Sequence, residues 1–196
     1  MLCPCGSGSD YQDCCAPLHR QKALAQTAEQ LMRSRYAAYV AHEIDYLVAT
    51  TVPAQQALLD REGMAQWSRQ AEWLGLDVLR HMDNLKPNHA QVAFVAHFAE
   101  QGQERRHEEL SAFVRVDGRW YFIDPTVPLP PMKQPCICGS GRKFKACCWQ
   151  FFPLMCAGKS SLHVGGCGIL CRLLFHVLNP PDVRWKASRA LGLARF

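Results

Sequence analysis

The chain has 196 residues, of which 48% are hydrophobic and 20% are charged, a composition that is typical of a globular protein and excludes a disordered one. Its net charge is +5, but residues 151–196 hold six Lys or Arg and one acidic residue, so residues 1–150 are neutral, with 16 residues of each sign. The overall charge therefore gives no reason to assign nucleic-acid binding to the body of the protein.

The first feature in chain order is a cysteine block at residues 1–20. It starts directly after Met1 and Leu2, without the charged region and apolar run of a secretory signal. We therefore expect a reducing, cytoplasmic setting without membrane contact, where thiols serve metal binding or catalysis rather than disulfides.

A helical region follows the first cysteine block. From Thr27, apolar residues recur at three- and four-residue steps through residues 23–51. Thr27 and Gln30 have the spacing of a capping box, in which the two side chains satisfy free N–H groups at a helix start. We expect a break near His42, a short helix that Pro53 ends, and a further helix over residues 56–71.

Residues 72–124 then change to a pattern typical of β-strands. Apolar, β-compatible segments are separated by turn signals, and Asp117-Gly118 is a hairpin signal. The expected strands cover residues 72–82, 91–100, 104–116 and 119–124, with a turn at 84–88. Helices followed by an antiparallel meander predict an α+β fold, with the helices packed on one face of a curved sheet.

A proline-rich linker over residues 125–135 leads to a second cysteine block, and a tail of different character follows. The tail contains Gly165-Gly166, Pro180-Pro181 and three further cysteines, without a clear period. We predict that this tail is basic and poorly ordered. The chain thus divides into four parts, at residues 1–20, 23–128, 133–150 and 151–196.

The two cysteine blocks share one pattern, C-x-C-G-S-G-x5-C-C. Four thiolates at the corners of a tetrahedron are a common zinc site, and such a site is structural because no coordination position stays open for substrate. The Gly-Ser-Gly segment turns the chain between the ligand pairs. We therefore predict two structural Zn²⁺ ions, with the ligands Cys3, Cys5, Cys14, Cys15 and Cys136, Cys138, Cys147, Cys148.

Disulfides or reactive thiols are the alternatives to zinc. Adjacent cysteines such as Cys14 and Cys15 rarely bridge each other without strain, and a thioredoxin-like site would need C-x-x-C. In the first block, His19 is an alternative fourth ligand in place of Cys15.

The cysteine spacing with its internal Gly-Ser-Gly resembles the SEC-C zinc motif, which is found at the C-terminus of the SecA translocation ATPase. Two such motifs around a middle segment resemble the bacterial, uncharacterised YchJ family, and segments such as residues 31–36, 72–76 and 118–121 fit it. This resemblance implies a nuclear transport factor 2-like middle domain, a cone of helices against a bent sheet. It also implies zinc binding at the eight cysteines and no established catalytic activity.

A cone of this kind can enclose a pocket between its helices and sheet. Glu109 is expected to line it, together with His97 and Asp124 from neighbouring strands, and such groups could perform general acid–base chemistry. The alternative, which we favour, is that Glu109 pairs with Arg33 or Arg35 and that His97 is a surface residue.

Two main functions follow from these patterns. The first is a non-enzymatic adaptor whose zinc knuckles contact a protein or ribosomal partner, as the similar motif of SecA contacts a protein. The second block has the more basic and aromatic surface, with the contact candidates Arg142, Lys143, Phe144 and Lys145. The second function is an isomerase, dehydratase or hydrolase that uses the middle-domain pocket. Direct nucleic-acid binding by the basic tail is a weaker third hypothesis.

Overall fold

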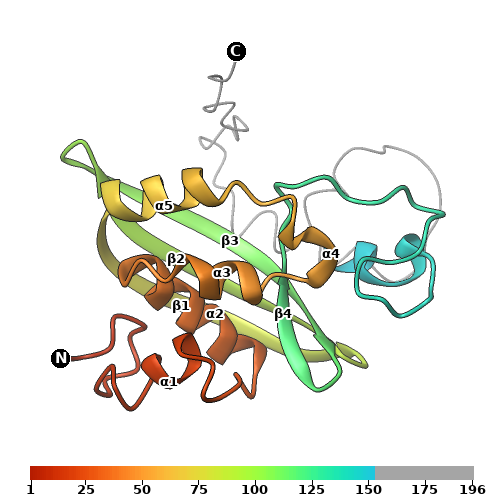
Figure 1. The fold of residues 1–196 in the computed structure, drawn as a ribbon, viewed down its shortest axis with the longest axis horizontal. Helices are drawn as coiled ribbons and strands as arrows, with labels where there is room; N and C mark the ends of the chain where they lie inside the picture. Colours follow the sequence, from red (N-terminus) through yellow and green to blue (C-terminus); the bar gives the residue numbers. More distant parts are fainter. Residues whose placement is uncertain (153–196) are drawn as a thin grey trace. The chain divides into compact units, whose positions relative to one another are not determined.

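The computed structural model describes residues 1–152, and the predicted disorder of the tail therefore lies almost wholly outside the described residues. Five α-helices precede four strands, and two short 3₁₀ helices follow them (Figure 1). The elements are α1 (Ala16–His19), α2 (Ala28–Val40), α3 (Ile44–Ala49), α4 (Pro53–Gln56), α5 (Arg61–Gln70), β1 (Glu72–Lys86), β2 (His89–Glu100), β3 (Gln103–Val116), β4 (Arg119–Ile123), η1 (Phe144–Ala146) and η2 (Cys148–Phe151).

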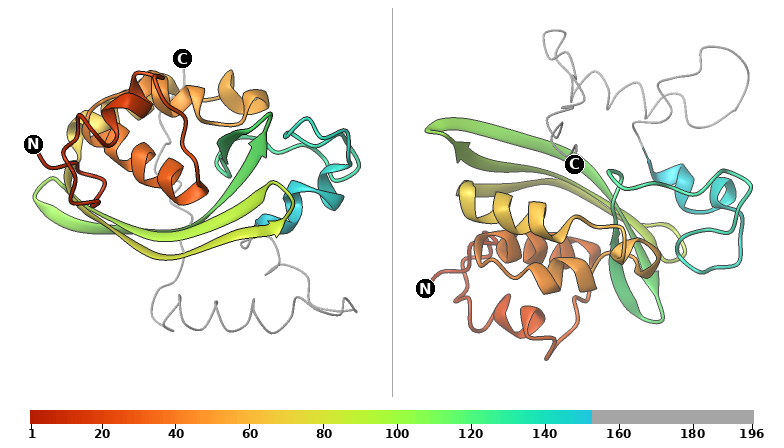
Figure 2. Two further views of the ribbon diagram at one scale, coloured as in Figure 1. Left: turned by 90° about the horizontal axis from the view of Figure 1, so that it is seen from below. Right: turned by 45° about the horizontal axis from the view of Figure 1, so that its top comes forward.

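The strands form one antiparallel sheet in the order β1-β2-β3-β4, and the helices cover one of its faces (Figure 2). The predicted α+β fold is therefore confirmed. Within residues 1–152, the helices are too short and too polar for any of them to cross a membrane.

Local sequence signals explain where the helices begin. The Thr27 hydroxyl accepts a hydrogen bond from the Gln30 amide at 3.0 Å, and thus caps α2. The Gln30 side chain accepts from the Gln26 amide rather than from Thr27, so only half of the predicted capping box is present. Pro53 occupies the first turn of α4, where its missing N–H costs nothing, so this residue begins a helix as well as following one.

The helix predicted over residues 56–71 begins later than expected. Gln56 is the last residue of α4, and α5 starts at Arg61. The preceding residue, Asp60, caps α5, because its side chain accepts a hydrogen bond from the Gly63 amide at 2.9 Å. The cap at Asp60 therefore fixes the start of α5 five residues later than the apolar pattern predicted.

The first hairpin of the sheet is longer than the sequence predicted. β1 continues to Lys86, through the predicted turn, and β2 already begins at His89. The pairing is irregular between Met82 and Lys86, and Asn84 has a φ of 56°. Cross-strand pairing therefore overrides the weak strand propensity of this segment.

Strand alternation places two hydrophobic clusters on the two faces of the sheet. Phe113 pairs with Ala90 in the β2–β3 ladder, and both belong to the core beneath the helices. The other buried residues of this core include Leu31, Met32, Leu47, Val92 and Trp120. This cluster is the core of the middle domain.

The second cluster joins the opposite face of the sheet to the C-terminal cysteine block. Ala112 and Val114 face away from the helices, because their neighbour Phe113 faces toward them. They share a cluster with the four cysteines of the second block and with Phe144, Phe151 and Phe152. Phe151 and Phe152 therefore pack with this block.

Candidate metal centres

The two cysteine blocks have the same backbone structure. The Cys3 amide donates to Ser9 O, and the equivalent Cys136 amide donates to Arg142 O, both at 2.8 Å. The first glycine of each Gly-Ser-Gly segment, Gly6 or Gly139, has a positive φ, a conformation that favours glycine. Each motif therefore forms the same tight loop, as the repeated sequence predicted.

The serine of each motif reaches the third cysteine. The Ser7 hydroxyl lies 3.3 Å from Cys14 Sγ, and the Ser140 hydroxyl lies 3.4 Å from Cys147 Sγ. Hydrogen bonds of this kind orient a sulfur and stabilise its negative charge. The sequence thus repeats a supporting contact as well as the four sulfur atoms.

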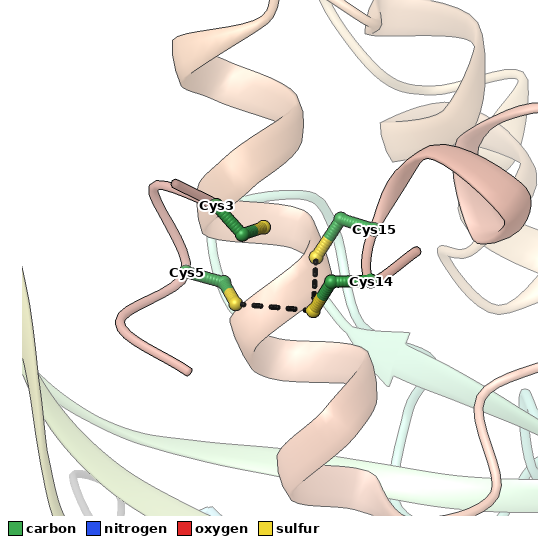
Figure 3. Close-up of side chains that lie close together, drawn as sticks. All are labelled: Cys3, Cys5, Cys14 and Cys15. Atoms are coloured by element: carbon green, nitrogen blue, oxygen red, sulfur yellow. Dashed lines mark hydrogen bonds between the residues drawn. The ribbon is translucent and has the colours of Figure 1, made fainter. Parts of the chain in front are cut away.

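The first four cysteines converge from two segments, the loop at Cys3 and Cys5 and the turn at Cys14 and Cys15 (Figure 3). Three of the four are buried, and Cys14 is half-buried. The cluster packs against Ala37 of α2, and Arg33 Nη1 donates to Cys5 O at 3.0 Å. The motif is therefore fixed to the middle domain through this helix.

The spacing of these sulfur atoms fits a tetrahedral metal ion. A Zn–S bond of about 2.3 Å at tetrahedral angles separates two sulfur atoms by about 3.8 Å. The Cys5 and Cys14 sulfur atoms are 3.6 Å apart, and those of Cys14 and Cys15 are 3.9 Å apart. The residues present therefore match the geometry and the ligand chemistry of zinc.

The neighbouring thiols oppose one another's ionisation. A hydrogen bond from Cys15 lowers the pKa of Cys5 to about 4, whereas the bond to Cys5 and burial raise the pKa of Cys15. Burial also raises the pKa of Cys3 to about 11. A divalent cation would relieve this mutual opposition, because its charge stabilises several thiolates at once.

The second cluster includes a donor that sequence reasoning missed. The side-chain donors of Cys138, Cys147, Cys148 and His89 all lie within 4.8 Å of one another, and all four residues are buried. Cys138 and Cys147 have sulfur atoms 3.6 Å apart. Cys136 is outside this mutually close set, although it is buried in the same apolar cluster.

The sequence contains little that would have identified His89. It lies far from the second block along the chain, next to the turn of the β1–β2 hairpin, and the strand was predicted to start at Gln91. A strand beginning at His89 would have placed its side chain on the same face as Gln91, which donates to Phe151 O at 3.0 Å. Only the docking of the second block on that face brings the imidazole to the thiols.

His19 does not approach the first cluster as a ligand. Its Nε2–H donates to Ser34 O at 2.9 Å, and its Nδ1 accepts from the Tyr11 hydroxyl at 2.8 Å. Both ring nitrogens are therefore engaged, and the structure offers no support for His19 in place of Cys15.

The three pocket candidates do not converge. His97 faces away from the helices and lies 2.8 Å from Asp77, whereas Glu109 faces toward them, since its partner in the ladder is Phe94. Asp124 accepts hydrogen bonds from Thr126 in a turn after β4. His97 and Glu109 are thus on opposite faces of the sheet, and no shared site for acid–base chemistry is formed.

The ion pair expected between Glu109 and an arginine of α2 is absent as well. Glu109 instead accepts from His107 Nε2, at 2.9 Å, and from the Ser111 hydroxyl. Arg33 pairs with Glu29 at 2.8 Å. Arg35 is buried, donates to Leu47 O and Thr50 Oγ1, and lies over the Phe122 ring. Glu109, Arg33 and Arg35 therefore each bond to other residues and not to one another.

The basic surface predicted for the second motif is present in part. Arg142, Lys143 and Lys145 are exposed. Phe144, however, is completely buried and packs against Trp149 and Phe152, so it cannot contact a partner. The aromatic ring instead forms the core that holds the motif to the sheet.

Comparison with protein families matches three parts of this chain. A model described as the YchJ middle NTF2-like domain matches residues 27–125, and the SEC-C motif matches residues 2–17 and 132–150. These matches and the two cysteine clusters together indicate metal binding.

Similar proteins cover most of the chain. A UPF0225 protein of Actinobacillus succinogenes is 54% identical over 150 residues, 76% of this chain and 97% of the relative. A crystal structure of a SEC-C motif containing protein from Psychrobacter arcticus has a TM-score of 0.72 and 43% identity, covering 76% of this chain and 96% of that one. A solution structure of a SEC-C motif containing protein from Rhodopseudomonas palustris has a TM-score of 0.59 and 42% identity, over 63% and 96% of the two chains.

Proposed function

Because this chain belongs to the YchJ family, also named UPF0225, we propose that it is a zinc-binding, non-enzymatic interaction protein. In this proposal, two structural zinc ions fold the two SEC-C motifs. The second motif then presents a basic surface to an acidic protein partner.

The convergence of the cysteines carries the zinc part of the proposal. The first cluster brings together donors from two segments and the second from three, at distances suited to a tetrahedral ion. The motifs have few apolar residues of their own, and metal ligation commonly supplies the folding free energy that such small units lack. The ions are structural because protein ligands fill all four positions.

The exposed cations carry the interaction part. Arg142, Lys143 and Lys145 are exposed on a motif that the buried Phe144 fixes to the sheet. At the positions that match Arg142, Lys143 and Lys145, the first motif has Ser9, Asp10 and Gln12, and none of these carries a positive charge. A rigid basic surface favours acidic partners, because opposite charges accelerate encounter and fix orientation.

The pocket enzyme that we considered receives less support. Its three candidate residues lie in different places, and two of them face opposite sides of the sheet. A cavity of about 220 Å³ lies elsewhere, beside the first cysteine cluster, with Cys5, Cys14 and Arg33 in its lining.

Metal analysis tests the zinc part. We expect two zinc ions per chain in protein purified under reducing conditions, and one per chain after Cys14→Ser, because loss of a ligand disables one tetrahedral site. Elemental analysis with protein quantification measures both. A zinc content near zero in the reduced wild-type chain would refute this part of the proposal.

Charge reversal tests the interaction part. Polyglutamate serves as the acidic probe, and we expect Lys143→Glu with Lys145→Glu to weaken binding at low salt. The control is Arg20→Glu with Lys22→Glu, which changes the same charge at exposed positions beside the first motif. Equal weakening by both pairs would contradict a specific basic surface, and RNase-sensitive binding to purified ribosomes would favour an RNA partner instead.

A further inference from the structure

We propose that His89 of the middle domain is a ligand of the second metal ion, together with Cys138, Cys147 and Cys148. The site is then a Cys₃His centre that takes a soft divalent cation such as zinc. This inference rests on the proposed metal binding, and it changes the ligand set that the SEC-C motif alone implies.

The distances to the imidazole nitrogen support this assignment. His89 Nε2 lies 3.4 Å from Cys148 Sγ and 3.7 Å from Cys147 Sγ. A tetrahedral zinc ion with Zn–S of about 2.3 Å and Zn–N of about 2.0–2.1 Å separates nitrogen from sulfur by about 3.6 Å. The two measured distances lie on either side of this value, as the Cys138–Cys147 distance of 3.6 Å lies near that for two sulfur ligands.

The other side of the imidazole is held as in known metal sites. Nδ1 lies 2.9 Å from Pro87 O, and since a carbonyl can only accept, Nδ1 carries the proton. The Nε2 lone pair therefore points to the thiols. A metal-binding histidine commonly donates its second N–H to a carbonyl in this way, which fixes its tautomer and orientation.

Burial and stacking hold the ring in this position. His89 is 6% exposed, and its ring stacks on Phe151 with centroids 4.6 Å apart and planes at 19°. A buried imidazole nitrogen without a partner costs free energy. The cysteines are the partners that the structure provides, and a metal ion at their centre would satisfy all four donors at once.

Five donors thus surround a site with four positions. Cys136 lies outside the mutually close set, although it is buried in the same apolar cluster. In our assignment, Cys136 packs beside the bound cysteines and does not contact the ion. The first cluster, by contrast, consists of four mutually close cysteines, so the equivalent Cys3 is a ligand there.

The assignment makes the second metal a link between two parts of the chain. His89 begins β2, whereas the three cysteines come from the C-terminal motif. The ion would therefore fasten the motif to the sheet, in addition to the apolar contacts of Phe144 and Phe151. Binding at this site then depends on the folded sheet, which presents His89.

Nuclear magnetic resonance of the wild-type chain tests the assignment directly. The full-length protein is labelled with ¹⁵N-histidine and loaded with ¹¹³Cd²⁺, a spectroscopic substitute for zinc at thiolate sites. We expect two cadmium resonances, one of which shows scalar coupling to His89 Nε2. Two bound cadmium ions without coupling to His89 would refute the inference and leave the proposed metal binding intact, whereas no bound cadmium would count against both.

Variants give an independent test with a matched control. Cys136→Ser should retain two zinc ions per chain, whereas Cys3→Ser, at the same motif position, should lose one. His89→Gln should weaken zinc binding at the second site by more than about tenfold, since even substitutions next to a metal ligand cost ten- to a hundredfold. Loss of one zinc from Cys136→Ser, with full retention in a folded His89→Gln variant, would restore the all-cysteine site and overturn the proposal.

Discussion

At the residue scale, three side chains of β3 satisfy one another's hydrogen bonds. These are His107, Glu109 and Ser111. Residues two apart on a strand share a face, and these three side chains form a chain of hydrogen bonds on β3. Burial raises the pKa of Glu109, but the bonds from His107 and Ser111 outweigh it, and the pKa lies below its usual value. The bond to Glu109 in turn raises the pKa of His107.

We predict that Glu109→Gln lowers the pKa of His107, because the variant removes the charge that stabilises the imidazolium. Titration of the His107 ring by nuclear magnetic resonance measures this, with the exposed His81 as an internal reference. A His107 pKa that does not change would show that the contact is not electrostatic.

The same pair predicts a pH dependence of stability. The raised pKa of His107 gives stability that is complete below its unfolded value, about 6.5, and is lost as the pH rises through the folded value. The lowered pKa of Glu109 gives stability that is lost as the pH falls through its folded value. The difference in unfolding free energy between wild type and Glu109→Gln should therefore be greatest between these two pKa values. Urea unfolding at several pH values measures it, and a difference that is constant with pH would contradict the linkage.

The partner of Glu109 also shows a limit of sequence reasoning. Strand alternation predicts that Glu109, Ser111 and Phe113 share one face, and the structure agrees. The predicted partner was an arginine of α2, but a neighbour two residues away on the same strand is closer. Alternation predicts faces, whereas the position of the facing helix decides which long side chains can meet.

At the element scale, the start of α2 was predictable and the end of β1 was not. Thr27 caps α2 as its sequence indicated, because the interaction spans only three residues. The end of β1 depends on pairing with β2, and this pairing carries the strand through a segment with turn propensity. Local signals therefore fix the helices, and contacts across the sheet fix the strands.

The cap at Thr27 is open to a direct test. We predict that Thr27→Ala lowers the free energy of unfolding by about 1 kcal/mol, because the Gln30 amide loses its acceptor. Thr27→Ser keeps the hydroxyl and should have a much smaller effect. Chemical denaturation measures both, and an equal loss in the two variants would show that the methyl group matters rather than the cap.

At the scale of the whole molecule, the two metal motifs attach to different sides of the middle domain. The first packs against α2 through Ala37, and the second packs on the sheet face opposite the helices. Figures 1 and 2 show them at opposite ends of the sheet. The two motifs thus have the same cysteine pattern but different packing partners. Within residues 1–152, only the second motif shares a large apolar cluster with the sheet.

Phe144 tests this attachment. It is fully buried, and Phe144→Ala should destabilise the protein by about 3–5 kcal/mol because it leaves a cavity between motif and sheet. Zinc content should stay at two per chain, since no ligand is removed. Leu58→Ala, at a position that is 52% exposed, is the control and should have a small effect. Thermal unfolding with metal analysis measures both, and a small effect of Phe144→Ala would refute a shared core.

The sequence by itself determined the α+β class, the repeated loop and the gathering of four cysteines in each motif. These features depend on short-range periodicity and spacing. The sequence also led to the family, which the comparisons confirm. Only the tertiary structure decided that Phe144 is buried, that His97 and Glu109 are separated, and that His89 faces the second cluster. These three results depend on how the second motif and the helices dock on the two faces of the sheet, and contacts between residues far apart in the chain leave no mark in local sequence.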